Sequence, residues 1–204
     1  MNLARLLQLA SPTLPVGAYS YSGGLEAAIE AGIVKDAESA EQWIGDVLEF
    51  SISRMELPIL KKMMQYPEEL KALNELFLAS RETAELRAES VQMGYSLRKL
   101  LLDLGVGEVP LEEPSFPAAF ALAASHWKIE PQAALQAYLW AWLENQVMAA
   151  VKGVPLGQTQ GQKMLLNLGN SLEKTSADDF GNFAPGLAML SSKHETQYSR
   201  LFRS

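Results

Sequence analysis

Apolar residues recur along most of the chain at intervals of three and four residues, which is the spacing of one face of an α-helix. The two-residue alternation typical of a half-buried strand is not sustained anywhere. Turns rich in Pro and Gly separate the helical segments, and these turns are short, which favours antiparallel packing of neighbouring helices. We therefore expect an all-α protein, a single-domain irregular helical bundle of about ten helices over residues 1–204. The predicted helices cover residues 3–10, 24–31, 40–54, a short stretch from 56, a stretch from 67, and residues 82–104, 116–127, 131–153 and 155–172.

Local signals fix some of the expected helix ends. Ser39 and Gln42 have the spacing of a capping box, which predicts a helix start near residue 40. Pro58 predicts the start of a separate short helix, and Pro131 stands at a first helical position. Residues 175–204 are read as a polar linker followed by a partner-binding C-terminal tail.

Composition excludes several classes of function. The chain has 204 residues with a formal net charge of −7, which is the wrong sign for a protein that follows nucleic-acid phosphates. It has no Cys and two His, so we expect no disulfide, no metal site and no cofactor. Its most apolar stretch, residues 131–151, contains polar side chains such as Glu144 and Gln146, which argues against a membrane span. No secretory signal is apparent, and we expect a cytoplasmic protein.

Motifs for catalysis are incomplete. Residues 157–163 imitate a phosphate-binding loop with the wrong spacing, and residues 20–24 imitate a nucleophile elbow without its first glycine. We therefore expect no catalytic residues. Two alternatives stay open: a small helical metal-dependent enzyme that uses Glu26 or Glu85 as its acid–base group, and a generic helical adaptor.

Three segments instead have the character of interaction surfaces. Residues 14–26 form a loop with two tyrosines and three glycines that leads into a helix. Gly157-Gln158 recurs as Gly161-Gln162, and this spacing places both glycines on one helix face, although each costs about 1 kcal/mol against alanine there. The tail combines aromatic and basic residues, and we expect it to be mobile in the free chain and ordered by a partner. The predicted partner-binding residues are Pro15, Gly17, Tyr19, Ser20, Glu26, Gly157, Gln158, Gly161, Gln162, Glu195, Tyr198, Arg200, Leu201, Phe202 and Arg203.

Four blocks of sequence carry a family resemblance. Residues 14–26, 83–90, 155–162 and 194–204, in this order, resemble the UreF family of urease accessory proteins, and together they span essentially the whole chain. One departure is Gly23, where family members often carry a polar residue such as His or Gln.

The resemblance implies an all-α scaffold in nickel-urease maturation that is not itself an enzyme. Such a protein binds UreD, called UreH in some species, recruits the nickel-carrying GTPase UreG, modulates GTP hydrolysis and acts on apo-urease. The resemblance, together with apolar segments that would otherwise face solvent, also predicts a homodimer.

Overall fold

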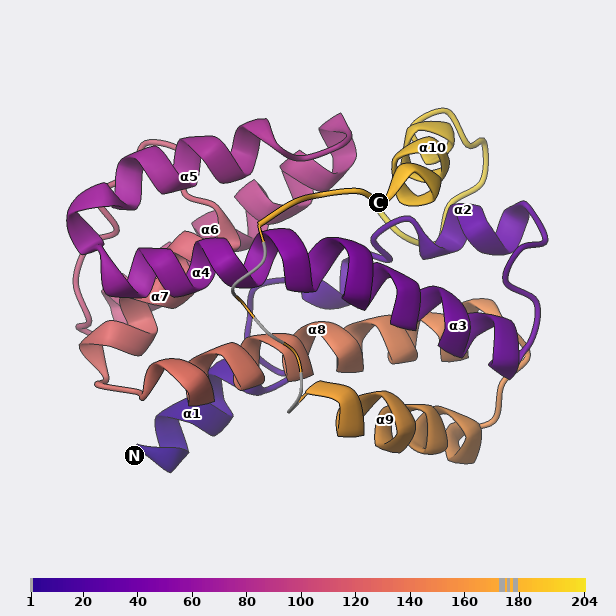
Figure 1. The fold of residues 1–204 in the computed structure, drawn as a ribbon, viewed down its shortest axis with the longest axis horizontal. Helices are drawn as coiled ribbons and strands as arrows, with labels where there is room; N and C mark the ends of the chain where they lie inside the picture. Colours follow the sequence, from indigo (N-terminus) through magenta and orange to yellow (C-terminus); the bar gives the residue numbers. More distant parts are fainter. Residues whose placement is uncertain (1, 173–174, 176, 178–179) are drawn as a thin grey trace.

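The computed structural model describes residues 2–172, 175, 177 and 180–204, and within these ranges the chain is helical and has no strand (Figure 1). The prediction of an all-α fold is confirmed. The α-helices are α1 (Leu3–Ala10), α2 (Leu25–Glu30), α3 (Ala37–Val47), α4 (Leu57–Gln65), α5 (Leu70–Ala79), α6 (Ala84–Asp103), α7 (Phe116–His126), α8 (Pro131–Gly153), α9 (Gln158–Leu172) and α10 (Pro185–His194). Two short 3₁₀ turns, Ala18–Ser20 and Pro67–Glu69, and a π-helical stretch, Leu48–Glu56, complete the helical structure of the described ranges.

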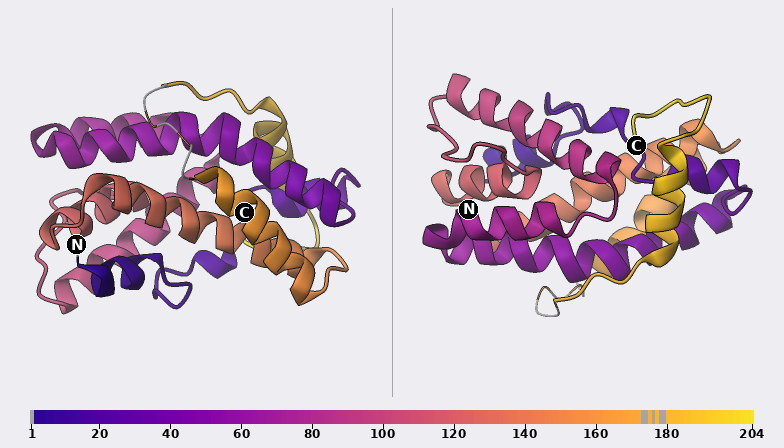
Figure 2. Two further views of the ribbon diagram at one scale, coloured as in Figure 1. Left: turned by 60° about the horizontal axis from the view of Figure 1, so that its bottom comes forward. Right: turned by 90° about the horizontal axis from the view of Figure 1, so that it is seen from above.

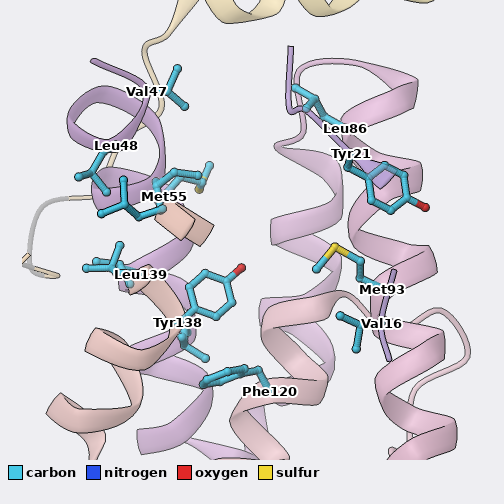
Figure 3. Close-up of a cluster of buried hydrophobic side chains, with 14 of the residues drawn as sticks. Val16, Tyr21, Val47, Leu48, Met55, Leu86, Met93, Phe120, Tyr138 and Leu139 are labelled. Atoms are coloured by element: carbon cyan, nitrogen blue, oxygen red, sulfur yellow. The ribbon is translucent and has the colours of Figure 1, made fainter. Parts of the chain in front are cut away.

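Helix α8 runs through the middle of the molecule and packs against α1, α2, α3, α4 and α9 (Figures 1 and 2). Its mixture of alanine with large apolar residues lets helices approach it from several sides. The rings of Phe116 and Phe120 on α7 contact the ring of Tyr138 on α8, with centroids 5.6 Å and 5.2 Å apart. In Figure 3, Tyr138 and Met93 point toward one another from opposite sides of this core.

The predicted break before Pro58 is wrong. Helix α3, the π-helical stretch Leu48–Glu56 and α4 follow one another without interruption, so residues 37–65 form one long rod. Proline lacks the N–H that an α-helix would direct at the carbonyl four residues earlier, here that of Arg54. The backbone N–H of Gly181 donates to this carbonyl at 2.9 Å, so a neighbouring segment satisfies the group that the proline leaves open.

Other helix ends differ from the prediction by a few residues. The capping box at the start of α3 is formed by Asp36 and Ser39, with the Ser39 N–H 2.9 Å from Asp36 Oδ1, and not by Ser39 and Gln42. Helix α9 begins at Gln158, three residues after Pro155. Part of the predicted linker, residues 176, 178 and 179, lies outside the described residues.

No helix in the described ranges is both long enough and apolar enough to span a lipid bilayer.

Candidate partner-binding surface

The loop of residues 14–26 and the end of the C-terminal tail lie side by side. The Arg203 N–H donates to the Ser20 carbonyl at 2.8 Å, and the Ser22 N–H donates to the Ser204 carbonyl at 3.0 Å. The Ser22 hydroxyl donates to the same carbonyl. Two segments that the sequence analysis selected separately therefore form one surface, near the C-terminus marked in Figure 1.

Glu26, in the first turn of α2, holds the tail in place. Its carboxylate accepts the backbone N–H groups of Leu201 at 2.6 Å and Phe202 at 2.9 Å. Helix α10, which precedes the tail, also lies close to the start of α2, because a Cβ atom on Gly24 would lie 2.8 Å from Leu187 Cδ1 on α10. The expectation of a tail that is free in the isolated chain is therefore corrected, because two adjacent N–H groups share one carboxylate acceptor on the chain's own domain.

His194, at the end of α10, is fully buried between two carboxylates. Its Nε2 lies 3.1 Å from Glu26 Oε2, and its Nδ1 lies 2.7 Å from Glu85 Oε2. Arg200 donates to the other oxygen of Glu85 at 2.6 Å. In the part of the chain that the structure describes, no group of three or more His, Cys, Asp or Glu residues is arranged to hold a metal ion. The carboxylates of Glu26 and Glu85 are engaged in binding the tail, which is a structural role.

Several side chains of the same surface point outward. Tyr19 is 68% exposed, Leu201 is 74% exposed, and Tyr198 is fully exposed. Phe202 is turned inward, with Lys152 Nζ 5.8 Å from its ring centroid. A hollow of about 490 Å³ lies beside them, lined mainly by loop residues 12–17 and 19–21, by Gln92 and Ser96 of α6, and by Arg203. We call the exposed residues Pro15, Tyr19, Tyr198, Leu201 and Arg203 the tail–loop surface.

The second predicted surface, at the start of α9, is altered by the structure. Gly157 precedes the helix, so the two glycines do not share a helix face as predicted. Gly161 is buried against α8, where an added Cβ would lie 2.8 Å from Val151 Cγ2, so the close packing is made within the chain. Gln158 and Gln162 are exposed and form what we call the glutamine face. Helix α9 lies on the other side of α8 from α10 and the tail in Figure 1.

Two residues of this site, Glu89 and Ser204, are absent from the individual partner-binding residues predicted from the sequence, although Ser204 lies within the predicted tail. The Ser204 hydroxyl donates to Glu89 Oε2 at 2.6 Å. Part of Glu89 reaches the surface, but burial of its carboxyl group raises its pKa to about 7, against the lowering effects of the Ser204 hydroxyl and Arg81. The available signal was the spacing of Glu85 and Glu89, which places both carboxylates on one face of α6.

The comparison with known proteins agrees with the family resemblance found in the sequence. The family model of UreF matches residues 34–169, two thirds of the chain. The chain belongs to the UreF family. The urease accessory protein UreF of Azoarcus sp. (strain BH72) is 53% identical, with 100% of this chain and 96% of that protein aligned. The urease accessory proteins UreF of Dechloromonas aromatica (strain RCB) and Methylobacillus flagellatus (strain ATCC 51484 / DSM 6875 / VKM B-1610 / KT) are 49% and 50% identical, each with 100% of this chain and 98% of the relative aligned.

Proposed function

We propose that this chain is a urease accessory protein that acts as a non-enzymatic scaffold in the cytoplasm. In this proposal it binds UreD, or UreH where the partner has that name, and recruits the GTPase UreG for nickel insertion into apo-urease. It also modulates GTP hydrolysis by UreG. The observation that carries the proposal is similarity over the full chain, at 53% identity, to a urease accessory protein UreF.

The tail–loop surface supports a scaffold role. Protein interfaces are often dominated by a few large amphipathic side chains such as Tyr and Arg, surrounded by contacts of little energy. Tyr19, Tyr198 and Arg203 are of this type, and Leu201 adds an exposed apolar side chain beside them. The backbone near Leu201 and Arg203 is already bonded to the domain. A partner that binds these side chains therefore does not pay the full entropic cost of ordering a free segment.

We assign the tail–loop surface to UreD. The glutamine face of α9 offers a second surface, with amide donors and acceptors but without aromatic residues. The separation of the two surfaces is compatible with simultaneous binding of two partners, as a scaffold requires.

Co-expression with a relative's UreD and UreG, followed by size-exclusion chromatography, tests the proposal. We expect the wild-type chain to elute with UreD and, when UreG is added, with both proteins. Replacing Tyr198 and Leu201 together by alanine should weaken the UreD complex by about thirtyfold or more, because losing an interface anchor costs about 2 kcal/mol.

The matched control is Leu102→Ala, which removes an exposed leucine at the end of α6, away from the tail. It should leave the complex and the melting temperature unchanged. A wild-type chain that elutes alone in the presence of both partners would contradict the proposed function. A complex that is insensitive to Tyr198→Ala/Leu201→Ala would contradict only the assignment of the surface.

A further inference from the structure

A cavity of about 280 Å³ lies inside the molecule, lined mainly by α8, α6 and residues 11–19 of the loop. Its walls are largely apolar and include Val16 of the loop, Met93 of α6, Phe116 of α7 and the rings of Tyr138 and Trp142 on α8. In Figure 3, Met93 and Tyr138 point toward one another from opposite sides. An apolar cavity of about 150 Å³ holds a benzene molecule, so one of this volume can take a ligand of roughly ten non-hydrogen atoms.

The cavity reaches the surface beside the loop. Pro12, Leu14, Val16 and Tyr19 line both this cavity and the surface hollow of about 490 Å³ described above. Tyr19 is 68% exposed, whereas Tyr138 on α8 is buried. The loop therefore offers a route from the surface to the buried part of the cavity.

The charged side chains that line the cavity are predominantly acidic. Among the described lining residues there are three carboxylates, Glu56, Glu89 and Glu144, and two cations, Arg81 and Lys152. Arg81 Nη1 donates to Glu56 Oε1 at 2.7 Å, so the only guanidinium of this lining is already paired. When all five groups are ionised, the lining has an excess of one negative charge, which favours a cationic ligand.

Glu89, on α6, is the carboxylate best placed to receive such a ligand. Its Oε2 accepts the Ser204 hydroxyl at 2.6 Å, and among the described residues no hydrogen bond reaches its Oε1. Burial raises the pKa of this carboxyl to about 7, because neither the Ser204 hydroxyl nor Arg81 offsets the loss of water. A cationic donor at Oε1 would supply the missing partner of the ionised form.

The surroundings suit an organic cation better than a metal ion. In the ranges that the structure describes, no three side chains of His, Cys, Asp or Glu are grouped to hold a metal. The rings of Phe116, Tyr138 and Trp142 line the cavity instead. Aromatic faces attract ammonium groups and also pack against the apolar body of a ligand.

We propose that this cavity binds a small organic ammonium ion, an amine with an apolar body of roughly nine carbon atoms. The ammonium group donates to Glu89 Oε1, and the apolar body packs against Met93 and the aromatic rings of the walls. This binding activity is additional to the scaffold function proposed above and does not depend on it.

Methyl NMR on the full chain tests the site, with 3-phenylpropylammonium as the probe. The titration is made at about pH 8, where Glu89 is mostly ionised because its pKa is about 7. With labelled methionine methyl groups, the signals of Met93 and Met148, which line the cavity, should shift and saturate with a Kd below about 1 mM. The signal of Met63, buried in α4 outside this lining, should stay in place.

Two matched probes test the chemistry of the ligand. The alcohol 3-phenylpropan-1-ol has the same apolar body with a neutral end, and 3-phenylpropanoate has an anionic end. We expect the ammonium to bind about tenfold more tightly than the alcohol, because a hydrogen bond between two charged groups is the stronger one, and the carboxylate to bind most weakly. An alcohol that binds as tightly as the ammonium, or a carboxylate that binds most tightly, would overturn the proposal.

The variant Glu89→Gln should weaken binding of the ammonium by about tenfold and leave that of the alcohol unchanged, so the preference for the cation is lost. The control Asp103→Asn removes a carboxylate from the exposed end of the same helix and should keep the preference. Unchanged ammonium affinity in Glu89→Gln would contradict the assignment.

A second variant covers the case that Glu89→Gln does not fold. Ala141→Leu, on α8, places a larger side chain in the cavity and should abolish the shifts of Met93 and Met148 with all three probes. The site is refuted if the ammonium shifts neither methyl group of the wild type at about 10 mM, or if Ala141→Leu binds it as the wild type does.

Discussion

The carboxylate of Glu26 contacts three groups near the C-terminus: it accepts the adjacent backbone N–H groups of Leu201 and Phe202 and lies beside the ring of His194. An acceptor of this kind stabilises the fold mainly because its loss leaves several polar groups without partners in a buried place. Tyr19, seven residues earlier in the same loop, is exposed. Neighbouring residues of one conspicuous motif therefore have different roles.

Replacing Glu26 by alanine should release the end of the C-terminal tail and lower the free energy of unfolding by about 2–3 kcal/mol, because two backbone donors and a buried imidazole lose their acceptor. Urea denaturation measures the loss, and hydrogen exchange at Leu201 and Phe202 reports the release. Tyr19→Ala is the control and should change stability by less than about 0.5 kcal/mol. Equal stability of the two variants would show that Glu26 does not anchor the C-terminal tail.

Gly94 on α6 gives a second prediction at this scale. A Cβ atom there would lie 2.1 Å from the Pro114 carbonyl oxygen, a backbone atom that has little freedom to move. Gly94→Ala should therefore destabilise the chain by about 2–4 kcal/mol in urea denaturation, in spite of the helix preference for alanine. In Gly45→Ala, on α3, the new Cβ would meet Leu168 Cδ2 at an ordinary 3.5 Å, so this control should be neutral or slightly stabilising.

Among the elements, the rod of residues 37–65 is joined to the turn between α5 and α6 and to α8 by a buried polar cluster. Glu56, at the end of the π-helical stretch, accepts Arg81 Nη1 at 2.7 Å and the Tyr138 hydroxyl at 2.5 Å. The side chains of Arg81 and Glu56 are both largely buried. A buried ion pair is weak evidence for net stabilisation, but removing one partner is costly because the other charge is left uncompensated.

Arg81→Met should accordingly lower the free energy of unfolding by about 3–5 kcal/mol, because it leaves the Glu56 carboxylate buried without its cation. The double variant Arg81→Met/Glu56→Gln removes both charges and should be less destabilised than Arg81→Met alone. Thermal and urea unfolding of the four proteins of this cycle give the coupling free energy between the two side chains. Additive effects would contradict the pairing.

For the whole molecule, α8 determines where the candidate surfaces lie. It separates α9 and the glutamine face from α10 and the tail–loop surface, so the two faces are presented on different sides (Figure 1). Exposed apolar side chains also occur away from both faces, among them Leu3 and Leu7, one turn apart on α1. Exposed apolar surface of this kind is typical of sites that another protein covers.

We expect the purified chain to self-associate into a homodimer. Light scattering coupled to size-exclusion chromatography should give a mass approaching twice the 22.4 kDa of one chain, increasing with protein concentration. The variant Leu3→Ser/Leu7→Ser tests whether α1 contributes to the contact. A mass of one chain at high micromolar concentration would contradict the prediction.

The sequence by itself determined the helical character of the chain, the positions of most helices and the family. Helices α1, α7 and α8 were predicted closely, because strong local signals agree there: Pro12 after α1, a small apolar run in α7, and Pro131 at the start of α8. Such signals depend on residues that are close in the chain, and they act before any tertiary contact forms.

Only the tertiary structure decided what the tail and the glycine motif do. The composition of the tail suits an outward-facing and an inward-facing segment equally well, and the deciding hydrogen bond, from Phe202 to Glu26, joins residues 176 positions apart. Gly161 packs against Val151 of α8, and Pro58 stays within a helix because Gly181 donates to the carbonyl that the proline leaves open. In each case the partner is distant in sequence, so neither spacing nor propensity specifies it, and the close packing of the folded chain does.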